Sequence, residues 1–326
     1  LFARLQVGLR AFFATEQPIV IVPASSTALM EMSVRAAPPG RILAMVNGAF
    51  SERFAKVARA CGRDVEQIDV PWGRAHDLRD VERELARTRY AAVTVVHCET
   101  STGVLSDVQA VARLAHAHGS VVLVDAVSSA GGTPLETDAW ELDFVFAGSQ
   151  KTLALPPGLA LGAARPSVVA SARANGGRGV YLDLAEYADF ARRNETPSTP
   201  ALSLLHALDA QVARMAIEGM AARIARHAAM AAATQQWVAR AAAGGLGVGI
   251  LAPEGHRSPT VTVITLPDGI PVADAVRAMK SRGYTVASGY GQLGRSCVRI
   301  GHMGEHTVEG LERCLAALDD ALRAFR

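Results

Sequence analysis

The sequence predicts an α/β protein, with a mostly parallel sheet between helices in a large domain and a smaller C-terminal α/β domain. Short apolar runs alternate with segments of helical period through about the first half of the chain. Several of these runs, such as 121–124, are apolar at every position, which is typical of parallel strands buried on both faces. After residue 200 the pattern changes to a long alanine-rich helical stretch and then to strand, helix, strand and helix.

In the large domain, most of the expected strands are runs of apolar residues bounded by polar or turn-forming ones. The strands are expected at 19–23, 41–46, 65–70, 91–97, 120–125 and 144–147, with 159–164 as a further pairing partner. The segments between them have a helical pattern, such as the charged face of 51–59. These helices are expected at 27–36, 50–61, 77–88 and 106–118.

In the second part, the alanine-rich segment 202–242 is expected to be helical with a break near Gly219. Strands at 260–266 and 298–300 and helices at 272–282 and 306–325 complete this part. A large domain over 1–225 and a small domain over 226–326 are therefore expected. The glycine-rich run 244–249 lacks the strand and helix of a dinucleotide-binding loop, so we expect a flexible connection.

The composition excludes several classes of function. The 326 residues carry a formal net charge of +2, which gives no reason to expect nucleic acid or a membrane as a partner. No apolar run approaches the roughly 20 residues of a membrane helix. The four cysteines are far apart, so we expect reduced, buried thiols and no disulfide scaffold or metal site. No secretory or peroxisomal signal is evident, and a cytoplasmic protein is expected.

Lysine is rare in this chain. Among its 33 lysine and arginine residues, only Lys56, Lys151 and Lys280 are lysines. Lys56 and Lys280 fall in helical stretches and are expected to be solvated. Lys151 follows an apolar strand and precedes a Pro-Pro-Gly turn, so a partly buried amine at a strand end is expected. Unlike arginine, a lysine amine can form an imine with an aldehyde.

A second candidate is Asp125, which ends the apolar run 121–124. Carboxyl ends of parallel strands face the crevice in which α/β proteins bind ligands, so Asp125 and Lys151 are expected there together. A helix cap or a structural acid is the alternative for Asp125 alone. An amine and a buried carboxylate suit pyridoxal phosphate, because the amine holds the aldehyde and the carboxylate keeps the pyridine nitrogen protonated. The released amine can then move the α-proton.

Three further features fit the same cofactor, and each has an ordinary structural alternative. The run Ser25-Ser26-Thr27 follows a strand and opens a helix, where backbone N–H groups can bind phosphate; a plain N-cap is the alternative. Phe50 lies at another strand-to-helix junction, where it would stack on the ring or belong to the core. Arg299 lies in an apolar strand, where a substrate carboxylate or an internal salt bridge would pair it.

These segments, in this order, resemble the class V (fold type I) pyridoxal-phosphate aminotransferases, specifically the alanine/serine–glyoxylate and serine–pyruvate branch. The resemblance covers nearly the whole chain. Its most specific segments are Gly-Ser-Gln-Lys at 148–151 with Pro-Pro-Gly at 156–158, and Glu-Thr-Ser-Thr-Gly at 99–103. The other matching segments are 24–28, 47–50, 97–98, 124–129, 196–200 and 299–304.

The resemblance implies a role for each candidate residue. Lys151 would bind the cofactor covalently, and Asp125 would pair with its pyridine nitrogen. Thr100 would contact the 3-hydroxyl side of the ring, on which Phe50 would stack. Arg299 would bind the substrate carboxylate.

The phosphate would be held by small polar side chains, and the neighbouring subunit's segment 196–200 would reach it. A homodimer with shared active sites is therefore implied. The phosphate set is Ser25, Ser26, Thr27 and Gln150, with Thr196 and Thr199 from the neighbour. The family often has glycine where this chain has Ser26, and the serine is expected to crowd the phosphate slightly. Relatives usually continue for some dozens of residues before the position of Leu1, with a Pro-Gly-Pro-like segment that lines the substrate pocket, so an N-terminally incomplete sequence is expected.

The activity implied is transamination by a ping-pong mechanism, from alanine or serine to glyoxylate or pyruvate. 2-Aminoethylphosphonate–pyruvate and ureidoglycine–glyoxylate transaminases are alternatives in the same class. A cysteine desulfurase needs a mobile nucleophilic cysteine, whereas Cys98 and Cys297 are expected in strands. A degenerate α/β binding protein is the alternative without catalysis, and the presence of Lys151, Asp125 and Arg299 argues against it.

Overall fold

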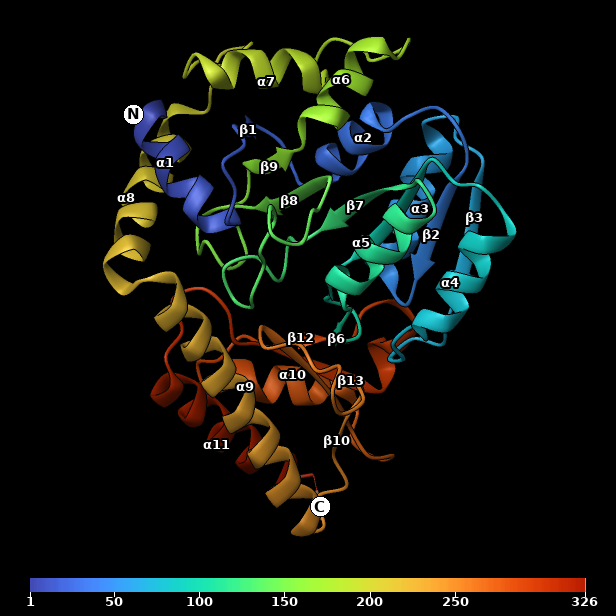
Figure 1. Cartoon of the computed structure of the whole chain (residues 1–326). Helices are drawn as coiled ribbons and strands as arrows, with labels where there is room; N and C mark the ends of the chain where they lie inside the picture. The colour runs from blue at the N-terminus through green and yellow to red at the C-terminus, as the bar shows by residue number, and fades with distance from the viewer. Residues whose placement is uncertain (326) are drawn as a thin grey trace.

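A seven-stranded sheet forms the centre of the larger lobe in the computed structural model, which describes residues 1–325 (Figure 1). Its strands are β1 (Ile19–Val22), β2 (Ile42–Val46), β3 (Val65–Asp69), β4 (Ala92–Val96), β7 (Val121–Asp125), β8 (Phe144–Gly148) and β9 (Ala160–Ala164). They are ordered β1-β9-β8-β7-β4-β2-β3. The five strands from β8 to β3 are parallel, and β9 runs antiparallel to both β8 and β1. The predicted α/β class and mostly parallel sheet are confirmed.

Helices cover both faces of this sheet, and successive strand residues point to opposite faces. In β8, Val145 packs in the core of one face, whereas Phe144 and Phe146 pack in the core of the other. The first face is covered by α1 (Phe2–Phe13), α4 (Leu78–Arg87), α5 (Val108–Ala117) and α8 (Leu202–Glu218). The second face is covered by α2 (Thr27–Ala36), α3 (Ala49–Ala60), α6 (Pro166–Ala174) and α7 (Leu184–Arg192). Burial on both faces explains why the inner strands are almost entirely apolar, whereas the edge strand β3 is partly exposed and carries Glu66, Gln67 and Asp69.

A small lobe follows the chain's long helical segment. The predicted break is confirmed at Gly219, which lies between α8 and α9 (Met220–Ala243). Its φ of 80° is not helical, so the helix is interrupted there. α8 lies along the large lobe and α9 along the small one (Figure 1). The small lobe packs α9, α10 (Val272–Ser281) and α11 (Val308–Arg323) around one apolar core. Its antiparallel sheet has the order β10 (Gly249–Ile250), β11 (Val261–Thr265), β13 (Cys297–Gly301), β12 (Ala287–Ser288). We propose that 1–225 and 226–326 act as the two domains.

Each helix and strand expected from the sequence is present within a few residues of its predicted ends. The sequence did not predict α1, α6, α7 or the hairpin of β5 (Cys98–Glu99) and β6 (Val104–Leu105). It also did not predict the short β10 and β12 or the 3-10 helix η1 (Gly291–Arg295). The signal for α1 was available, because Leu5, Leu9 and Phe12 are buried at helical spacing. The run 244–249 connects α9 to β10, and its Leu246 and Val248 are buried in the small-lobe core.

The four cysteines are free thiols. Cys98 and Cys297 are buried as predicted, but the prediction of burial was wrong for Cys61 and Cys314, which are partly exposed. Cys61 lies at the C-terminal end of α3, where the helix reaches the surface. Between residues 1 and 325, no helix has both the length and the apolar character needed to cross a membrane.

Candidate active site

A cavity at the carboxyl ends of β4, β7 and β8 brings most of the predicted site residues together. It contains about 520 Å³ of space, its open mouth included. Asp125 ends β7, and Lys151 lies in the turn that follows β8. The predicted residues that line it are Ser25, Ser26, Thr27, Phe50, Thr100, Asp125, Gln150 and Lys151. The other lining residues are Cys98, which the sequence placed in a strand, and Met30, Arg53, Val96, Val127 and Ser128, for which the sequence predicted no role.

A larger hollow of about 1030 Å³ lies between α9 and α11 on the small lobe. Its lining includes Trp237, Arg240 and Asp319 but no lysine. Asp319 is already paired with Arg323 at 2.5 Å. We assign the candidate active site to the smaller cavity, because the nucleophilic amine and the buried acid lie there.

Lys151 and Asp125 have strongly perturbed electrostatics. Burial lowers the pKa of the Lys151 amine, and the charge of Arg299 lowers it further. Burial raises the pKa of Asp125 to about 7, although the Val127 N–H donates to its Oδ1 at 2.9 Å. Neither group forms an ion pair within the part of the chain that the structure describes. A partly buried amine and a buried acid that both lack a counter-ion are typical of a site that receives a charged ligand.

The cavity fits pyridoxal phosphate at both ends. At one end, the Asp125 carboxyl lacks a cationic partner among residues 1–325, and a protonated pyridine nitrogen would supply one. At the other end, α2 begins without a side-chain cap. The Ala28 N–H donates to Ser25 O at 2.9 Å and the Leu29 N–H to Ser26 O at 3.0 Å, whereas the N–H groups of Ser26 and Thr27 have no acceptor among the described residues and are available to an anion. The Ser26 hydroxyl donates to Ala147 O at 3.3 Å, and the alternative of a plain N-cap is therefore not observed.

Gly148, at the end of β8, leaves room for this arrangement. A Cβ atom at Gly148 would lie 2.4 Å from the Ser26 Oγ and 2.9 Å from the Gln150 Oε1. Real Cβ atoms do not approach oxygen that closely, so any larger residue would push Ser26 and Gln150 apart. The expected crowding by Ser26 stays a prediction, and its hydroxyl is directed to the sheet side, at Ala147 O.

Glu99, a residue of the matching segments for which no role was predicted, holds the start of α3. Its side chain is fully buried. Its Oε2 accepts the N–H groups of Phe50 at 3.1 Å and Ser51 at 2.9 Å, and its Oε1 accepts the Ser101 N–H at 3.1 Å. These charge-assisted bonds satisfy N–H groups that a helix start leaves without partners. Glu99 therefore fixes the backbone that carries the Phe50 ring into the cavity.

We expect Glu99→Gln to lower the free energy of unfolding by about 1–3 kcal/mol, because an amide NH₂ group would face buried N–H donors. Urea unfolding measures this change. The matched control is Glu52→Gln, an exposed residue in the first turn of the same helix, for which a change within about 0.5 kcal/mol is expected. Equal losses in both variants would contradict a specific role for Glu99 at the helix start.

Arg299 approaches the site from β13 of the small lobe. Its Nε donates to Ser288 O at 2.9 Å, and its guanidinium carbon lies 5.7 Å from the centroid of the Tyr290 ring. No carboxylate of the described residues pairs with it, so the alternative of an internal salt bridge is not observed. Burial lowers the pKa of Arg299. Arg53 of α3, which lines the cavity, donates to the Tyr290 hydroxyl at 3.1 Å, so Tyr290 lies between Arg53 and Arg299. Tyr290 and Arg299 themselves lie outside the cavity lining.

Cys98 lines the cavity but is not an activated nucleophile. Its thiol donates to the Ser258 Oγ at 2.9 Å. Burial raises the pKa of Cys98 to about 11, which keeps the thiol protonated at neutral pH. The residue lies in β5 rather than on a loop, as the sequence predicted. Both observations argue against a desulfurase.

The Thr100 and Ser128 hydroxyls, which also line the cavity, share a hydrogen bond of 2.5 Å.

Thr196 and Thr199 lie outside the cavity. The Thr196 hydroxyl donates to Ser198 O at 2.8 Å, and Thr199 is exposed. Their predicted contact is with a neighbouring subunit, so it stays a prediction.

Within residues 1–325 no group of three or more His, Cys, Asp or Glu side chains is arranged to hold a metal ion.

The family model described as aminotransferase class V matches residues 12–313. The small subunit of a soluble hydrogenase from Synechococcus sp. is 33% identical over 99% of this chain and 84% of its own. Serine–glyoxylate aminotransferase from Methylorubrum extorquens is 35% identical over 96% of this chain and 80% of its own. The crystal structure of alanine–glyoxylate aminotransferase from Nostoc sp. has a TM-score of 0.90 at 28% identity, covering 99% of this chain and 86% of that one.

Proposed function

The chain belongs to the class V aminotransferases, and from this premise we propose that it is a pyridoxal-phosphate-dependent transaminase of small amino acids. The proposed reaction moves the amino group of alanine or serine to glyoxylate or pyruvate in two half-reactions of a ping-pong cycle. The observation that supports it best is that Lys151 and Asp125 line one cavity, beside the start of α2, which has no side-chain cap. Relatives named as serine–glyoxylate and alanine–glyoxylate aminotransferases support the substrate class.

In this proposal, Lys151 carries the proton transfer. Bound pyridoxal phosphate supplies an electron sink for the negative charge that develops at the substrate α-carbon. Lys151 holds the cofactor in the resting enzyme, and its amine, once released, moves the α-proton. Because burial lowers the pKa of this amine, a larger fraction of it is the free base at neutral pH. Asp125 holds a proton on the pyridine nitrogen, which keeps the sink effective.

The remaining cavity residues bind and orient. Ser25, Ser26, Thr27 and Gln150, with the start of α2, hold the phosphate, while Phe50 stacks on the ring and Thr100 contacts its 3-hydroxyl side. Arg299 holds the substrate α-carboxylate through two parallel N–H···O bonds. The carboxylate held at Arg299 and the base at Lys151 then fix which bond of the α-carbon is broken.

The test measures each half-reaction with purified protein and added pyridoxal phosphate. L-Alanine and L-serine are expected to bleach the visible absorbance of the lysine-bound cofactor, and glyoxylate or pyruvate should restore it while forming glycine or alanine. Ethylamine and ethanolamine, which lack the carboxylate, serve as controls and should react at least about 100-fold more slowly, since each lost charged hydrogen bond costs 1.5–3 kcal/mol. If 2-aminoethylphosphonate or ureidoglycine bleached the absorbance and alanine and serine did not, the protein would be one of those transaminases instead. If no donor bleached it, transamination would be refuted.

We also infer a homodimer in which each subunit completes its neighbour's phosphate site. Thr196 and Thr199 lie outside their own cavity, and the exposed apolar side chains of Val7, Val180 and Leu202 offer surface that a second copy would cover. Thr199→Ala is expected to weaken cofactor binding about tenfold. Hybrids with Lys151→Ala subunits should regain one tight site per dimer, because an intact Lys151 then meets an intact Thr199. A monomer in sedimentation, or no recovery in hybrids, would contradict the shared site.

A cytoplasmic location is inferred from the thiols. All four cysteines are free, and two of them are partly exposed. Such thiols persist in a reducing compartment. Fractionation of cells that produce the native protein would test the location.

A further inference from the structure

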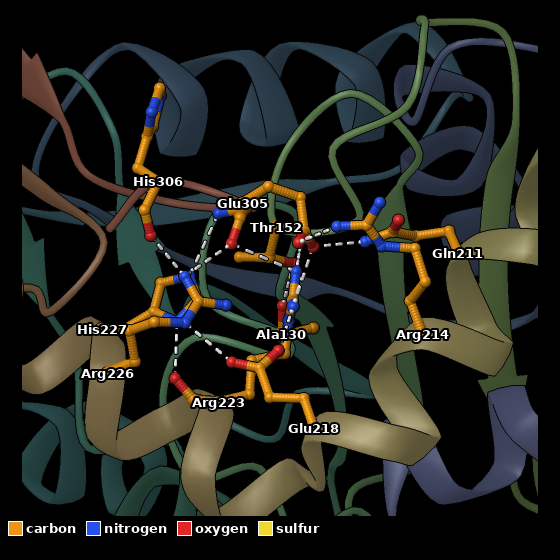
Figure 2. A network of polar contacts seen from close by, with 11 residues as sticks. Ala130, Thr152, Gln211, Arg214, Glu218, Arg223, Arg226, His227, Glu305 and His306 are labelled. Carbon is orange, nitrogen blue, oxygen red and sulfur yellow. Dashed lines mark hydrogen bonds and ion pairs between the residues drawn. The ribbon is translucent and has the colours of Figure 1, made fainter. Parts of the chain in front are cut away.

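A buried arginine outside the cavity connects the two segments that carry Lys151 and Arg299. Arg223 lies in the first turn of α9, directly after the break at Gly219, and its side chain is fully buried. Figure 2 shows it within a network of charged and polar groups from both lobes. None of these groups lines the cavity.

On the large lobe, the Arg223 Nη2 donates to Thr152 O at 2.6 Å. Thr152 follows Lys151 directly, and its own hydroxyl donates to Ala130 O. The carbonyl that Arg223 holds therefore belongs to the turn that presents the Lys151 side chain to the cavity. The position of this turn depends on a contact with a helix 71 residues further along the chain.

On the small lobe, the same guanidinium reaches the segment that follows β13, the strand that carries Arg299. Its Nη2 also donates to Gly304 O at 3.3 Å, and its Nη1 pairs with Glu305 at 3.0 Å. The same Nη1 pairs at 2.6 Å with Glu218, the last residue of α8 on the large lobe. Two carboxylates and two carbonyls offset much of the cost of burying the charge, and the Nε of Arg223 is buried without a hydrogen-bond partner among the described residues. Only a planar group with several donors can bind partners in this number, so lysine is not equivalent at this position.

His227, one turn along α9, supports the same segment. Its Nδ1 lies 2.7 Å from Arg223 O, and its Nε2 accepts the Gly304 N–H at 3.1 Å. A carbonyl oxygen can only accept, so Nδ1 carries the hydrogen and the ring is neutral. Gly304 packs directly on the lysine turn, because a Cβ there would lie 3.0 Å from the Ala154 Cβ and 3.4 Å from Lys151 O.

We propose that Arg223 is a positioning residue for transamination, which sets the placement of Lys151 relative to Arg299 across the two lobes. The inference rests on the proposed function, in which Arg299 holds the carboxylate of the substrate whose α-proton Lys151 moves. A misplacement of about 1 Å between such groups can cost about 100-fold in rate. Arg223 is suited to prevent it, because one guanidinium binds the backbone beside Lys151 and the backbone beyond Arg299.

The first test compares kcat per active site, with sites counted from the bound cofactor so that unfolded protein does not contribute. Arg223→Gln is expected to lower kcat about 100-fold, with the KM of the amino donor changed less than about threefold. Arg223→Lys should recover part of the loss. The matched control is Arg214→Gln, which removes an exposed arginine paired with Glu305 at 3.1 Å and should leave kcat within about twofold. An unchanged kcat per site in Arg223→Gln would overturn the proposal.

The second test needs neither cofactor nor activity. Hydrogen exchange of the cofactor-free chain, followed by mass spectrometry, should be faster in 150–155 and 301–306 of Arg223→Gln and unchanged elsewhere. Arg226→Gln, which loses bonds to Gly304 and His306 but none to Thr152, should change only 301–306. A uniform increase over the whole chain would show a merely structural role and overturn the proposal.

These measurements keep the two hypotheses apart. If the unmodified chain does not transaminate, the proposed function fails, and the exchange pattern still decides whether Arg223 holds the two segments together. If Arg223→Gln does not fold, Arg223→Lys carries both comparisons, since it keeps the charge but cannot reach all four partners. Normal exchange and normal kcat per site in Arg223→Lys would then refute the inference.

Discussion

Replacing Lys151 with alanine is expected to lower kcat/KM for transamination by about 10⁴-fold. The variant loses the amine that holds the cofactor and moves the α-proton, and proton transfer alone contributes up to about 10⁴-fold. The measurement is product formation from the active donor and acceptor at saturating cofactor. The visible absorbance of the lysine-bound cofactor should disappear in the same variant.

The chain offers two matched controls for this experiment. Lys56 on α3 and Lys280 on α10 are its other lysines, and both are exposed. Lys56→Ala and Lys280→Ala are expected to keep activity within about twofold, as surface substitutions do. Borohydride reduction should leave the cofactor mass on the peptide that contains Lys151 alone. Label on Lys56 or Lys280, or more than about 1% of the activity left in Lys151→Ala, would contradict the assignment.

Asp125→Asn is expected to have opposite effects on activity and on stability. Activity should fall by roughly 10²–10³-fold, because an amide cannot supply the fixed negative charge that keeps the pyridine nitrogen protonated. Steady-state kinetics at saturating cofactor measures this loss. Asn has nearly the same size and shape as Asp, so the change isolates the charge. Activity within about tenfold of the unmodified protein would contradict the role given to Asp125.

The effect on stability follows from the pKa. Asp125 has a pKa of about 7 in the folded chain, against about 3.9 when unfolded. Between these pH values the folded chain keeps a proton that the unfolded chain has released, so the free energy of unfolding falls as pH rises from about 4 to about 7. This loss is on the order of 4 kcal/mol. The Asn variant has no charge to bury, so its free energy of unfolding does not fall in this way as pH rises.

Without cofactor, Asp125→Asn should therefore be more stable than the unmodified protein at pH 8 and about equally stable below pH 4. Urea unfolding at both pH values checks this. A variant that is less stable at pH 8 would mean that the folded chain stabilises the ionised carboxylate. The expected combination, a more stable but inactive protein, is typical of residues kept for function at the expense of stability.

The sequence predicted the parts of the site that depend on local pattern. Lys151 and Asp125 were found because each follows a recognisable strand, and parallel strands end at one edge of the sheet. Glu99 and Arg223 were not found, because their partners lie 48 and 71 residues away along the chain. Nothing local distinguishes a buried arginine that binds carbonyls from one on a solvated helix face.

In the fold, too, the elements with a local sequence pattern were predicted and those that depend on distant partners were not. Strands apolar on both faces identified the central sheet, and the break at Gly219 was predicted from one residue. The two-residue strands β10 and β12 were missed because they exist only through pairing with β11 and β13. The missed α7 buries Leu184, Tyr187, Ala188 and Ala191, a helical pattern that was present but not recognised.

The pairing of β1 with β9 has a consequence for how the protein is made. β1 is the apolar edge strand Ile-Val-Ile-Val, and its Ile19 pairs with Ala163, which the ribosome adds about 140 residues later. At roughly 5–20 residues per second, β1 waits about seven to thirty seconds for its partner. Throughout that interval the nascent chain has an apolar strand with unpaired backbone groups. Such strands bind chaperones and promote aggregation.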